Sequence, residues 1–379
     1  MIVFEQGPGG QAAVFDRPDA LFVAQAGAEV ADTLAAAEAA RAKGAWIAGY
    51  VAYEAGYALE PRLEALMPEG RRGPLVCLAA YAGPGDASAV LAQAGAEAGG
   101  VRLADLQPQI SRTGYDAAIG KVAGYIAAGD CYQINLTFPI GSRLKAGSAL
   151  GLFGALRERQ AVGFGAFMDM GVGPVVISRS PELFFRVTGG VIESRPMKGT
   201  APRSDDPVED AALAAELRAS EKAQAENLMI VDLLRNDIAR ISEVGSVKVP
   251  ELYAVESFAT VHQMSSRVQG RLLGGAGLPG LMAALFPCGS ITGAPKIRAM
   301  EIIAEVEDTP RGVYCGALGW AAPDGTQCWS VGIRTLRLWP DGEVLLNVGG
   351  GVVYDSTADG EWEEALWKAR FATGLGPTG

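Results

Sequence analysis

The sequence predicts an α+β protein built on antiparallel β-sheets. Strand-like and helix-like segments fall in separate blocks along the chain instead of alternating, which is the pattern of segregated architectures. The chain has 379 residues, of which 49% are hydrophobic, and this is enough to build a large core. No apolar run reaches the roughly 18 residues that a membrane-spanning helix needs. We therefore expect a globular protein that does not associate with membranes.

Charge and cysteine content narrow the class of function. The formal net charge is −11, whereas nucleic-acid-binding proteins concentrate Lys and Arg on their surface. A small-molecule substrate is therefore expected, and no nucleic-acid partner. The five cysteines are scattered without the spacing of a disulfide framework or a zinc site. Because the N-terminus also lacks a secretion signal, we expect a cytoplasmic protein.

The N-terminal region, residues 1–108, is rich in Ala and Gly and carries little recognisable chemistry. A helix is predicted from Ala31 to Lys43 and a strand over 46–53. Residues 83–100 are mostly small and predict an irregular surface segment. We place a boundary near residue 108, so that the main domain covers 109–379.

The main domain is predicted to begin with a helix from about Thr113 to a stop at Gly129, with Asp116 completing an approximate capping box. Further elements follow from hydrophobic periodicity. Strands are predicted over 175–178, 183–187, 329–338 and 344–348, and helices over 207–241, 295–306 and 361–373.

The last predicted helix carries an acidic stripe. Glu361, Glu364 and Lys368 stand at i, i+3 and i+7 and share one face, between apolar side chains, so the stripe is expected to point inward. Glu226, on the helix predicted over 207–241, also has apolar neighbours on its face. Inward carboxylates need compensation, and Mg²⁺ is one solution. A surface contact with Lys368, or a network satisfied by arginines, explains the same pattern.

Two isolated residues allow catalytic or structural interpretations. His262 is the only histidine, and a lone histidine is more often a hydrogen-bonded core residue than a catalyst. Lys198 lies between a proline and a glycine and is presented from a rigid turn. Such a lysine can be a nucleophile if it is desolvated, although a solvated loop cation is the commoner case.

The segment 289–295 leads into the helix predicted over 295–306 and contains Ser290, Thr292 and Gly293. A helix start of this kind offers free N–H groups to an anion such as a carboxylate. Lys296 follows a proline and not a glycine, so the nucleotide-phosphate signature is not met.

These segments, in this order, resemble the chorismate-utilising family that includes anthranilate synthase component I, aminodeoxychorismate synthase component I, isochorismate synthase and salicylate synthase. The resemblance extends over about 111–373 and is weaker in the N-terminal third. It rests on residues 129–136 (GDCYQINL), 180–182 (SPE), 195–200 (RPMKGT), 225–233 (AENLMIVDL), 289–296 (GSITGAPK), 333–335 (IRT) and 349–351 (GGG).

The resemblance implies two large antiparallel sheets packed as a sandwich with helices outside, and a catalytic domain over 109–379 that binds chorismate and one Mg²⁺. It places Glu226 and Glu364, with Glu361 nearby, around the metal. The implied substrate-binding residues are Thr200, Ser290, Thr292, Gly293, Arg334, Gly349, Gly350, Gly351 and Lys368. The implied catalytic residues are Lys198, Glu182 and His262.

Lys198 decides the branch of the family. Anthranilate synthases typically have alanine there, whereas aminodeoxychorismate synthases resemble this chain in having lysine. The resemblance then implies a covalent lysine adduct, amination of chorismate at C4 for 4-aminobenzoate and folate synthesis, and ammonia from a glutamine amidotransferase subunit. Anthranilate synthase component I, isochorismate synthase, a non-catalytic chorismate-binding subunit and a Schiff-base lyase are the alternatives.

Overall fold

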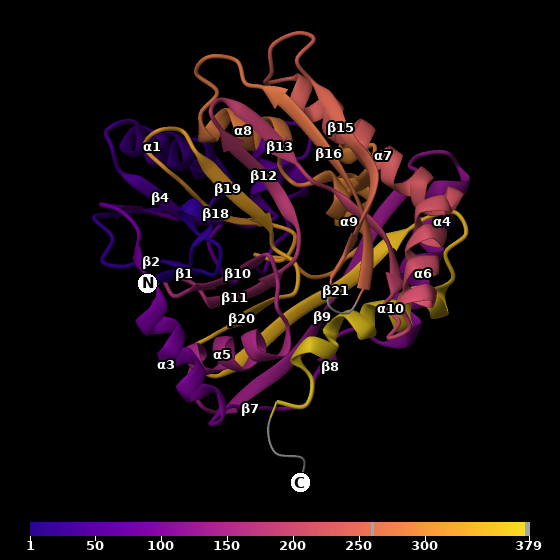
Figure 1. Cartoon of the computed structure of the whole chain (residues 1–379), viewed down its shortest axis with the longest axis horizontal. Helices are drawn as coiled ribbons and strands as arrows, with labels where there is room; N and C mark the ends of the chain where they lie inside the picture. The colour runs from indigo at the N-terminus through magenta and orange to yellow at the C-terminus, as the bar shows by residue number, and fades with distance from the viewer. Residues whose placement is uncertain (259–260, 376–379) are drawn as a thin grey trace.

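The structure is a computed structural model that describes residues 1–258 and 261–375. Strands in this part of the chain pair antiparallel in two sheets, one of eleven strands and one of ten, and helices lie at the periphery (Figure 1). The predicted α+β class with antiparallel sheets is confirmed.

The strands of the eleven-stranded sheet are β1 (Ile2–Phe4), β2 (Ala13–Phe15), β6 (Gly85–Asp86), β7 (Arg102–Leu103), β8 (Gln107–Pro108), β9 (Gln133–Ala146), β10 (Phe164–Met168), β11 (Val175–Ser180), β17 (Gly293–Ala294), β20 (Thr335–Leu338) and β21 (Glu343–Val352). Their order is β17-β9-β21-β20-β11-β10-β1-β2-β6, with β7 and β8 also paired to β9.

The strands of the ten-stranded sheet are β3 (Ala20–Ala24), β4 (Trp46–Val51), β5 (Val76–Tyr81), β12 (Leu183–Thr188), β13 (Val191–Ser194), β14 (Met197–Pro202), β15 (Lys248–Ser257), β16 (Val261–Arg271), β18 (Ala317–Ala321) and β19 (Gln327–Val331). Their order is β14-β16-β13-β12-β19-β18-β4-β5-β3, with β15 on β16.

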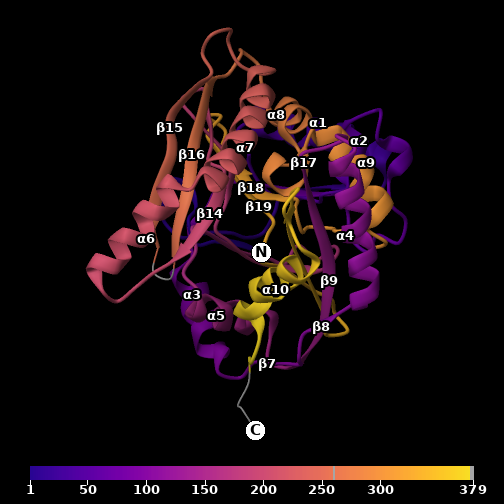
Figure 2. The ribbon, with the colours of Figure 1, turned by 90° about the vertical axis from the view of Figure 1, so that its right-hand side faces the viewer.

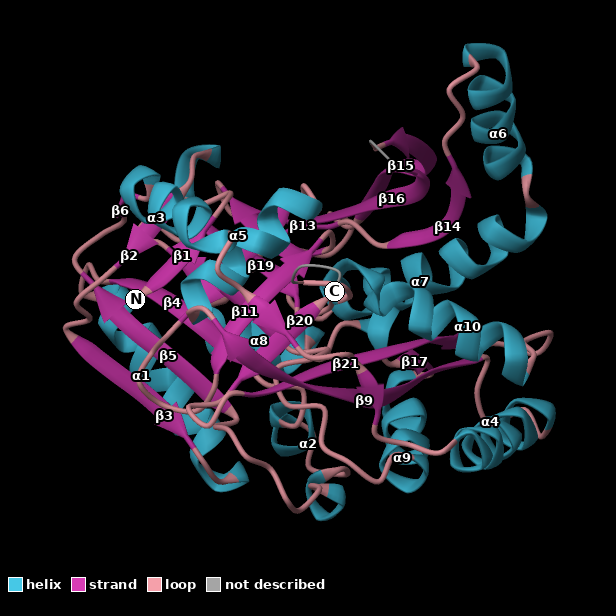
Figure 3. Cartoon of the chain, turned by 90° about the horizontal axis from the view of Figure 1, so that it is seen from below, coloured by secondary structure: helices cyan, strands magenta, loops and turns pink. Residues whose placement is uncertain are grey.

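The helices are α1 (Val30–Ala42), α2 (Ala55–Leu59), α3 (Ser88–Ala98), α4 (Arg112–Ala127), α5 (Ala149–Arg159), α6 (Pro207–Ala219), α7 (Glu221–Ala239), α8 (Leu278–Leu285), α9 (Lys296–Val306) and α10 (Ala358–Ala369). Helix α7 packs on β14 and β16, α10 on β21, and α4 and α9 on β9 (Figure 2). Helix α6 lies at the edge of the molecule beside β14, β15 and β16 (Figure 3). No helix within the described ranges is long and apolar enough to cross a bilayer.

The two sheets pack face to face through aromatic side chains. Phe15 of the eleven-stranded sheet lies 6.1 Å, between ring centroids, from Trp46 of the ten-stranded sheet. Trp46 in turn lies 5.9 Å from Trp320. Large rings of this kind contribute much of the energy of a core. Strands from residues 1–108 belong to both sheets and pair with strands from beyond residue 108, so the two regions share one core.

Two neighbouring crossovers carry the chain between the sheets, and their position fixes the site described below. The chain passes from β11 to β12 through Pro181 and Glu182, and from β19 to β20 through 332–334. The N–H of Arg179 donates to the carbonyl of Arg334 at 3.0 Å, and the N–H of Val331 donates to the carbonyl of Glu182 at 3.1 Å. These bonds hold the two crossovers side by side.

Three predicted elements differ from the structure. The segment 83–100, predicted to be irregular, contains helix α3, which buries Ala94 and Ala98 against α5. The helix predicted over 207–241 is two helices, because Ser220 has extended backbone angles and caps α7 with its side chain. The strand predicted over 329–338 is β19 and β20, which belong to different sheets.

The start of α4 gives a test of local stability. The predicted cap was Thr113, but the hydroxyl of Ser111 accepts the N–H of Gly114 at 3.0 Å. Ser111→Ala is expected to lower the free energy of unfolding by about 1 kcal/mol, because the N–H loses its partner. Urea unfolding of Ser111→Ala and of Thr113→Ala measures this. An equal loss in both variants would contradict the assignment of the cap to Ser111.

Candidate active site

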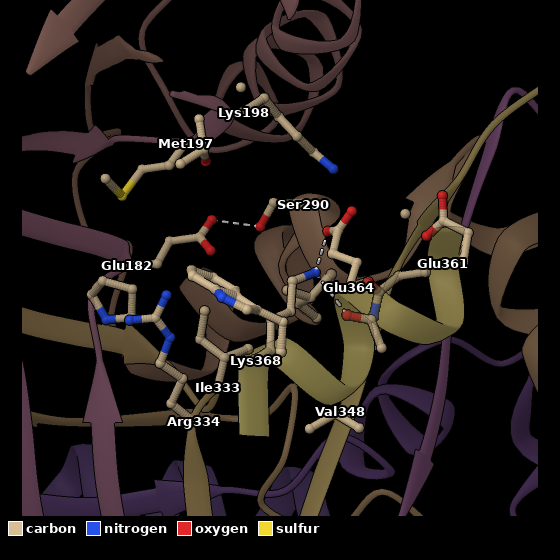
Figure 4. Close-up of a pocket in the computed structure, with 18 of the residues that line it drawn as sticks. Glu182, Met197, Lys198, Ser290, Ile333, Arg334, Val348, Glu361, Glu364 and Lys368 are labelled. Carbon is tan, nitrogen blue, oxygen red and sulfur yellow. Dashed lines mark hydrogen bonds and ion pairs between the residues drawn. The ribbon is translucent and has the colours of Figure 1, made fainter. Parts of the chain in front are cut away.

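A pocket of about 520 Å³, here called the first pocket, opens where the two crossovers meet. One wall comes from the β11–β12 crossover and β14, and another from β21, α10 and the start of α7. Predicted site residues that line it are Glu182, Lys198, Thr200, Glu226, Ser290, Arg334, Gly349, Gly351, Glu361, Glu364 and Lys368. Residues more than 180 positions apart in sequence, such as Glu182 and Glu364, thus face one cavity (Figure 4).

Glu182 is a buried carboxylic acid at the pocket wall. Its side chain is 6% exposed and Oε1 accepts the Ser290 hydroxyl at 2.6 Å (Figure 4). Burial raises the pKa of Glu182 to about 6, although the Ser290 hydrogen bond and nearby Lys198 act in the opposite direction. With such a pKa, part of the Glu182 population is protonated near neutral pH, and this acid form can serve as a general acid.

Lys198 enters the pocket from an irregular strand. The pairing of β14 with β16 shifts register between Met197 and Thr200, and Gly199 has a φ of +85°. A bulge of this type redirects side chains, so Met197 and Lys198 both line the pocket. Lys198 Nζ donates to Gln133 Oε1 at 3.1 Å, and burial lowers the pKa of Lys198. A larger fraction of Lys198 is therefore neutral at a given pH than for a lysine in water, and the neutral amine can act as a nucleophile.

Two cations lie across the pocket from Lys198. Arg334 stands in the β19–β20 crossover with a φ of +50°, and burial lowers its pKa. Lys368 Nζ donates to the carbonyl of Gly349 at 2.8 Å and pairs with Glu364 Oε1 at 2.7 Å. Fixed cations in a partly desolvated pocket favour anionic ligands such as carboxylates.

Glu361 and Glu364 project from α10 towards β21 (Figure 4). A Cβ built on Gly350 would lie 2.7 Å from Glu361 Oε2 and 3.7 Å from Glu364 Oε1, so both carboxylates converge on this glycine. Burial raises the pKa of Glu361, and Glu364 adds to the effect. The Glu364 side chain is 55% exposed, because the predicted inward stripe faces an open pocket and not the core.

These carboxylates and Glu226 offer oxygen ligands, which suit Mg²⁺. In the described part of the chain no three Asp, Glu, His or Cys side chains lie close enough together to form a metal site by themselves. Since Mg²⁺ usually keeps several water or substrate ligands, one or two carboxylates of this wall suffice. The donor chemistry fits the predicted ion.

Four predicted residues lie outside the pocket lining. Gly350 lies between two lining glycines in β21. Thr292 and Gly293 are buried behind the wall, where the carbonyl of Thr292 accepts the N–H of Asn135 at 2.8 Å. His262 is 1% exposed, and its ring nitrogens bond Ser257 and Asp210, each at 2.9 Å. These contacts correspond to the structural interpretation of a lone histidine.

A family model described as chorismate binding enzyme matches residues 1–374. The chain belongs to this family. The matched range covers both sheets and every residue that lines the first pocket. The cavity between the two crossovers is therefore the candidate active site of this chorismate binding enzyme.

Curated relatives of this chorismate binding enzyme come from more than one branch. Aminodeoxychorismate synthase component 1 of Klebsiella aerogenes is 43% identical over 68% of this chain and 57% of its own length. Anthranilate synthase component 1 of Streptomyces coelicolor is 40% identical over 79% of this chain and 57% of its own length. The chain thus spans somewhat more than half the length of these relatives.

Among solved structures, anthranilate synthase component I of Streptococcus pneumoniae is similar with a TM-score of 0.80 and 25% identity, over 98% of this chain and 92% of that one. The fold predicted from the resemblance is therefore confirmed for this chorismate binding enzyme.

Several lining residues were not among the predicted site residues of this chorismate binding enzyme. Lys222, Asn347 and Trp367 line the first pocket, whereas Gln133 lies outside this lining and accepts a hydrogen bond from Lys198 Nζ. Gln133 stood in a recognised motif, and a fully buried amide within a strand is a signal of a polar partner. Asn347 is likewise a buried amide within a strand, but it stands outside the motifs on which the resemblance rests.

Proposed function

We propose that this chain is the chorismate-aminating component of an aminodeoxychorismate synthase. It would convert chorismate and ammonia, the latter delivered by a glutamine amidotransferase subunit, to 4-amino-4-deoxychorismate and water. The observation that carries the proposal is that Lys198 and Glu182 line the same pocket. Burial shifts the pKa of the lysine down and that of the glutamate up, towards the protonation states that a nucleophile and a general acid need.

The reaction balances with these two groups. The neutral Lys198 amine forms a bond to C2 of chorismate, both double bonds of the ring shift by one position, and the C4–O bond breaks while Glu182 gives its proton to the departing hydroxyl as water. Ammonia then forms a bond to C4, both double bonds shift back, and the C2–Nζ bond breaks. The Glu182 carboxylate accepts the proton that ammonia loses. Both groups return to their starting states.

The remaining lining groups would hold the substrate. Chorismate is a dicarboxylate, and Arg334 and Lys368 offer cations on the side of the pocket opposite Lys198. Gly349 leaves no room for a side chain, because a Cβ there would overlap the carbonyl of Leu136, so β21 can lie close against β9 at this point of the pocket wall. One or two of Glu226, Glu361 and Glu364 would hold Mg²⁺, and the ion would neutralise a substrate carboxylate.

Loss of a carboxylate from α10 tests the metal proposal. Glu364→Gln is expected to raise the Mg²⁺ concentration for half-maximal activity at least about tenfold, because one charged oxygen ligand is removed. Calorimetric titration with Mg²⁺ in the presence of chorismate gives a second readout. Glu363→Gln on the exposed face of the same helix is the matched control. Equal Mg²⁺ requirements in both variants would place the metal elsewhere.

Product identity tests the function itself. The purified chain is incubated with chorismate, Mg²⁺ and ammonium, and the product is identified by mass spectrometry and chromatography. Formation of 4-amino-4-deoxychorismate supports the proposal. Anthranilate or isochorismate would keep the family but assign another branch, and no consumption of chorismate would identify a non-catalytic binding subunit.

The partner and the location are part of the same proposal. Addition of a glutamine amidotransferase subunit with glutamine is expected to replace ammonium as the nitrogen source. The five cysteines are all buried free thiols, which suits the reducing cytoplasm.

A further inference from the structure

A second pocket, of about 280 Å³, lies beside the loop 70–75. Its other walls come from residues 309–313 and from β20 and β21. The indole of Trp339 and four prolines, Pro74, Pro139, Pro174 and Pro310, supply rigid apolar surface. The volume is enough for a ligand with a single ring, so this pocket is smaller than the first pocket and differs from it in character.

Arg337 brings a buried cation to this pocket. Its side chain is 7% exposed, and burial lowers its pKa to about 10. Nη2 donates to Asn347 Oδ1, whereas Nε has no acceptor in the described chain. Buried donors without acceptors are uncommon and costly. The guanidinium therefore has free hydrogen-bonding capacity in the wall of the second pocket, which also includes Glu54 and Glu343.

The carboxylates around Arg337 are engaged with other partners. Glu54 accepts the backbone N–H groups of Arg311 and Gly312, at 2.6 Å and 3.0 Å. Glu343 pairs with Arg72 at 2.5 Å. No ion pair of Arg337 is found within residues 1–258 and 261–375, so a negative charge from outside the chain would complete the site.

Two further features suit a ligand that has a ring and a negatively charged group. A Cβ on Gly312 would lie 2.5 Å from Arg337 Nη1, so the glycine makes room for the guanidinium. The indole Nε1 of Trp339 is buried and has no acceptor among the described residues. The half-exposed Arg72 lies over the Trp339 ring, 4.2 Å from its centroid, at the rim.

We propose that the second pocket binds a small aromatic carboxylate. The carboxylate would accept hydrogen bonds from the Arg337 guanidinium, and the ring would lie against the prolines and the Trp339 indole. A planar guanidinium matches a carboxylate, and apolar walls favour a ring over a fully hydrated ion. This inference does not depend on the reaction proposed for the first pocket.

Calorimetric titration with benzoate tests the site. The experiment uses Arg334→Gln protein, so that the cations of the first pocket contribute less to binding. Benzoate is expected to bind with one-to-one stoichiometry. Benzamide, which has the same shape without the charge, is expected to bind at least about tenfold more weakly than benzoate. Benzoate is expected to bind at least about tenfold more weakly to the Arg334→Gln, Arg337→Met double variant than to the Arg334→Gln protein.

Four results would overturn the proposal. Equal binding of benzamide would show that charge is not recognised, and unchanged binding to the double variant would place benzoate elsewhere. Competition by inorganic phosphate at similar affinity would show an unselective anion site. If the double variant does not fold, crystals of the wild-type chain with 4-bromobenzoate decide the question. Anomalous bromine density beside Trp339 supports the site, and bromine only in the first pocket contradicts it.

Discussion

Lys198→Ala is expected to lower the rate of 4-amino-4-deoxychorismate formation at least about a thousandfold, because the covalent route loses its nucleophile. The space left by the side chain would also expose C2 to ammonia, so the residual product is expected to shift towards amination at C2. Mass spectrometry of the products measures both effects. Intact-mass analysis of the wild-type chain with chorismate and no ammonium is expected to show an adduct of chorismate less one water.

Two control variants distinguish loss of the positive charge of Lys198 from loss of its nucleophilic amine. Lys198→Arg keeps a cation that cannot act as a nucleophile at neutral pH, and it is expected to be as inactive as the alanine variant. Lys222→Ala removes another lysine of the pocket wall, one that is 61% exposed and paired with Asp355, and is expected to retain most of the activity. A Lys198→Ala enzyme with more than about a tenth of the wild-type rate would exclude the covalent mechanism.

Glu182→Gln is expected to lower kcat by about 10²- to 10⁴-fold, the usual contribution of a general acid. The amide keeps the size of the side chain and a partner for Ser290 but cannot give up a proton. The pH profile gives an independent readout, since the pKa of Glu182 is raised to about 6.

The sign of the pH effect follows from the two roles. The acid form of Glu182 disappears as pH rises through about 6, which lowers the wild-type rate. The neutral form of Lys198 increases with pH, and its lowered pKa brings this increase towards neutrality. A bell-shaped profile is expected for the wild type, and the variant should lose the fall that begins near pH 6. A variant that keeps this fall would show that another group donates the proton.

The sequence predicted the helix-borne part of the site better than the part carried by loops. On α10, a rotation of about 100° per residue is enough to place Glu361, Glu364 and Lys368 on one face, and the structure has them there. That this face points inward was also predicted, but the extent of its burial could not be, because it depends on the distance to β21. The hydrophobic periodicity of a segment predicts its secondary structure and its faces, but it does not predict which other element packs against each face.

Crossovers between sheets show the same limit. The stretch 329–338 has strand-forming residues on both sides of Arg334, and the tertiary structure divides it there between two sheets. Helix α3 was missed because small residues are common both in loops and in closely packed helices. Glu182 and Lys198 were found through short motifs, whereas the contact between Lys198 and Gln133 needs two strands of different sheets to approach each other.

The position of the first pocket has a mechanical consequence. Lys198 and Glu182 are attached to strands of the ten-stranded sheet, whereas Gly349 and Lys368 belong to the eleven-stranded sheet and the helix on it. A ligand that contacts residues of both sheets is expected to resist sliding of one sheet over the other. Bound chorismate is therefore expected to slow amide hydrogen exchange in β14 and β21 together, although no hydrogen bond joins these two strands directly.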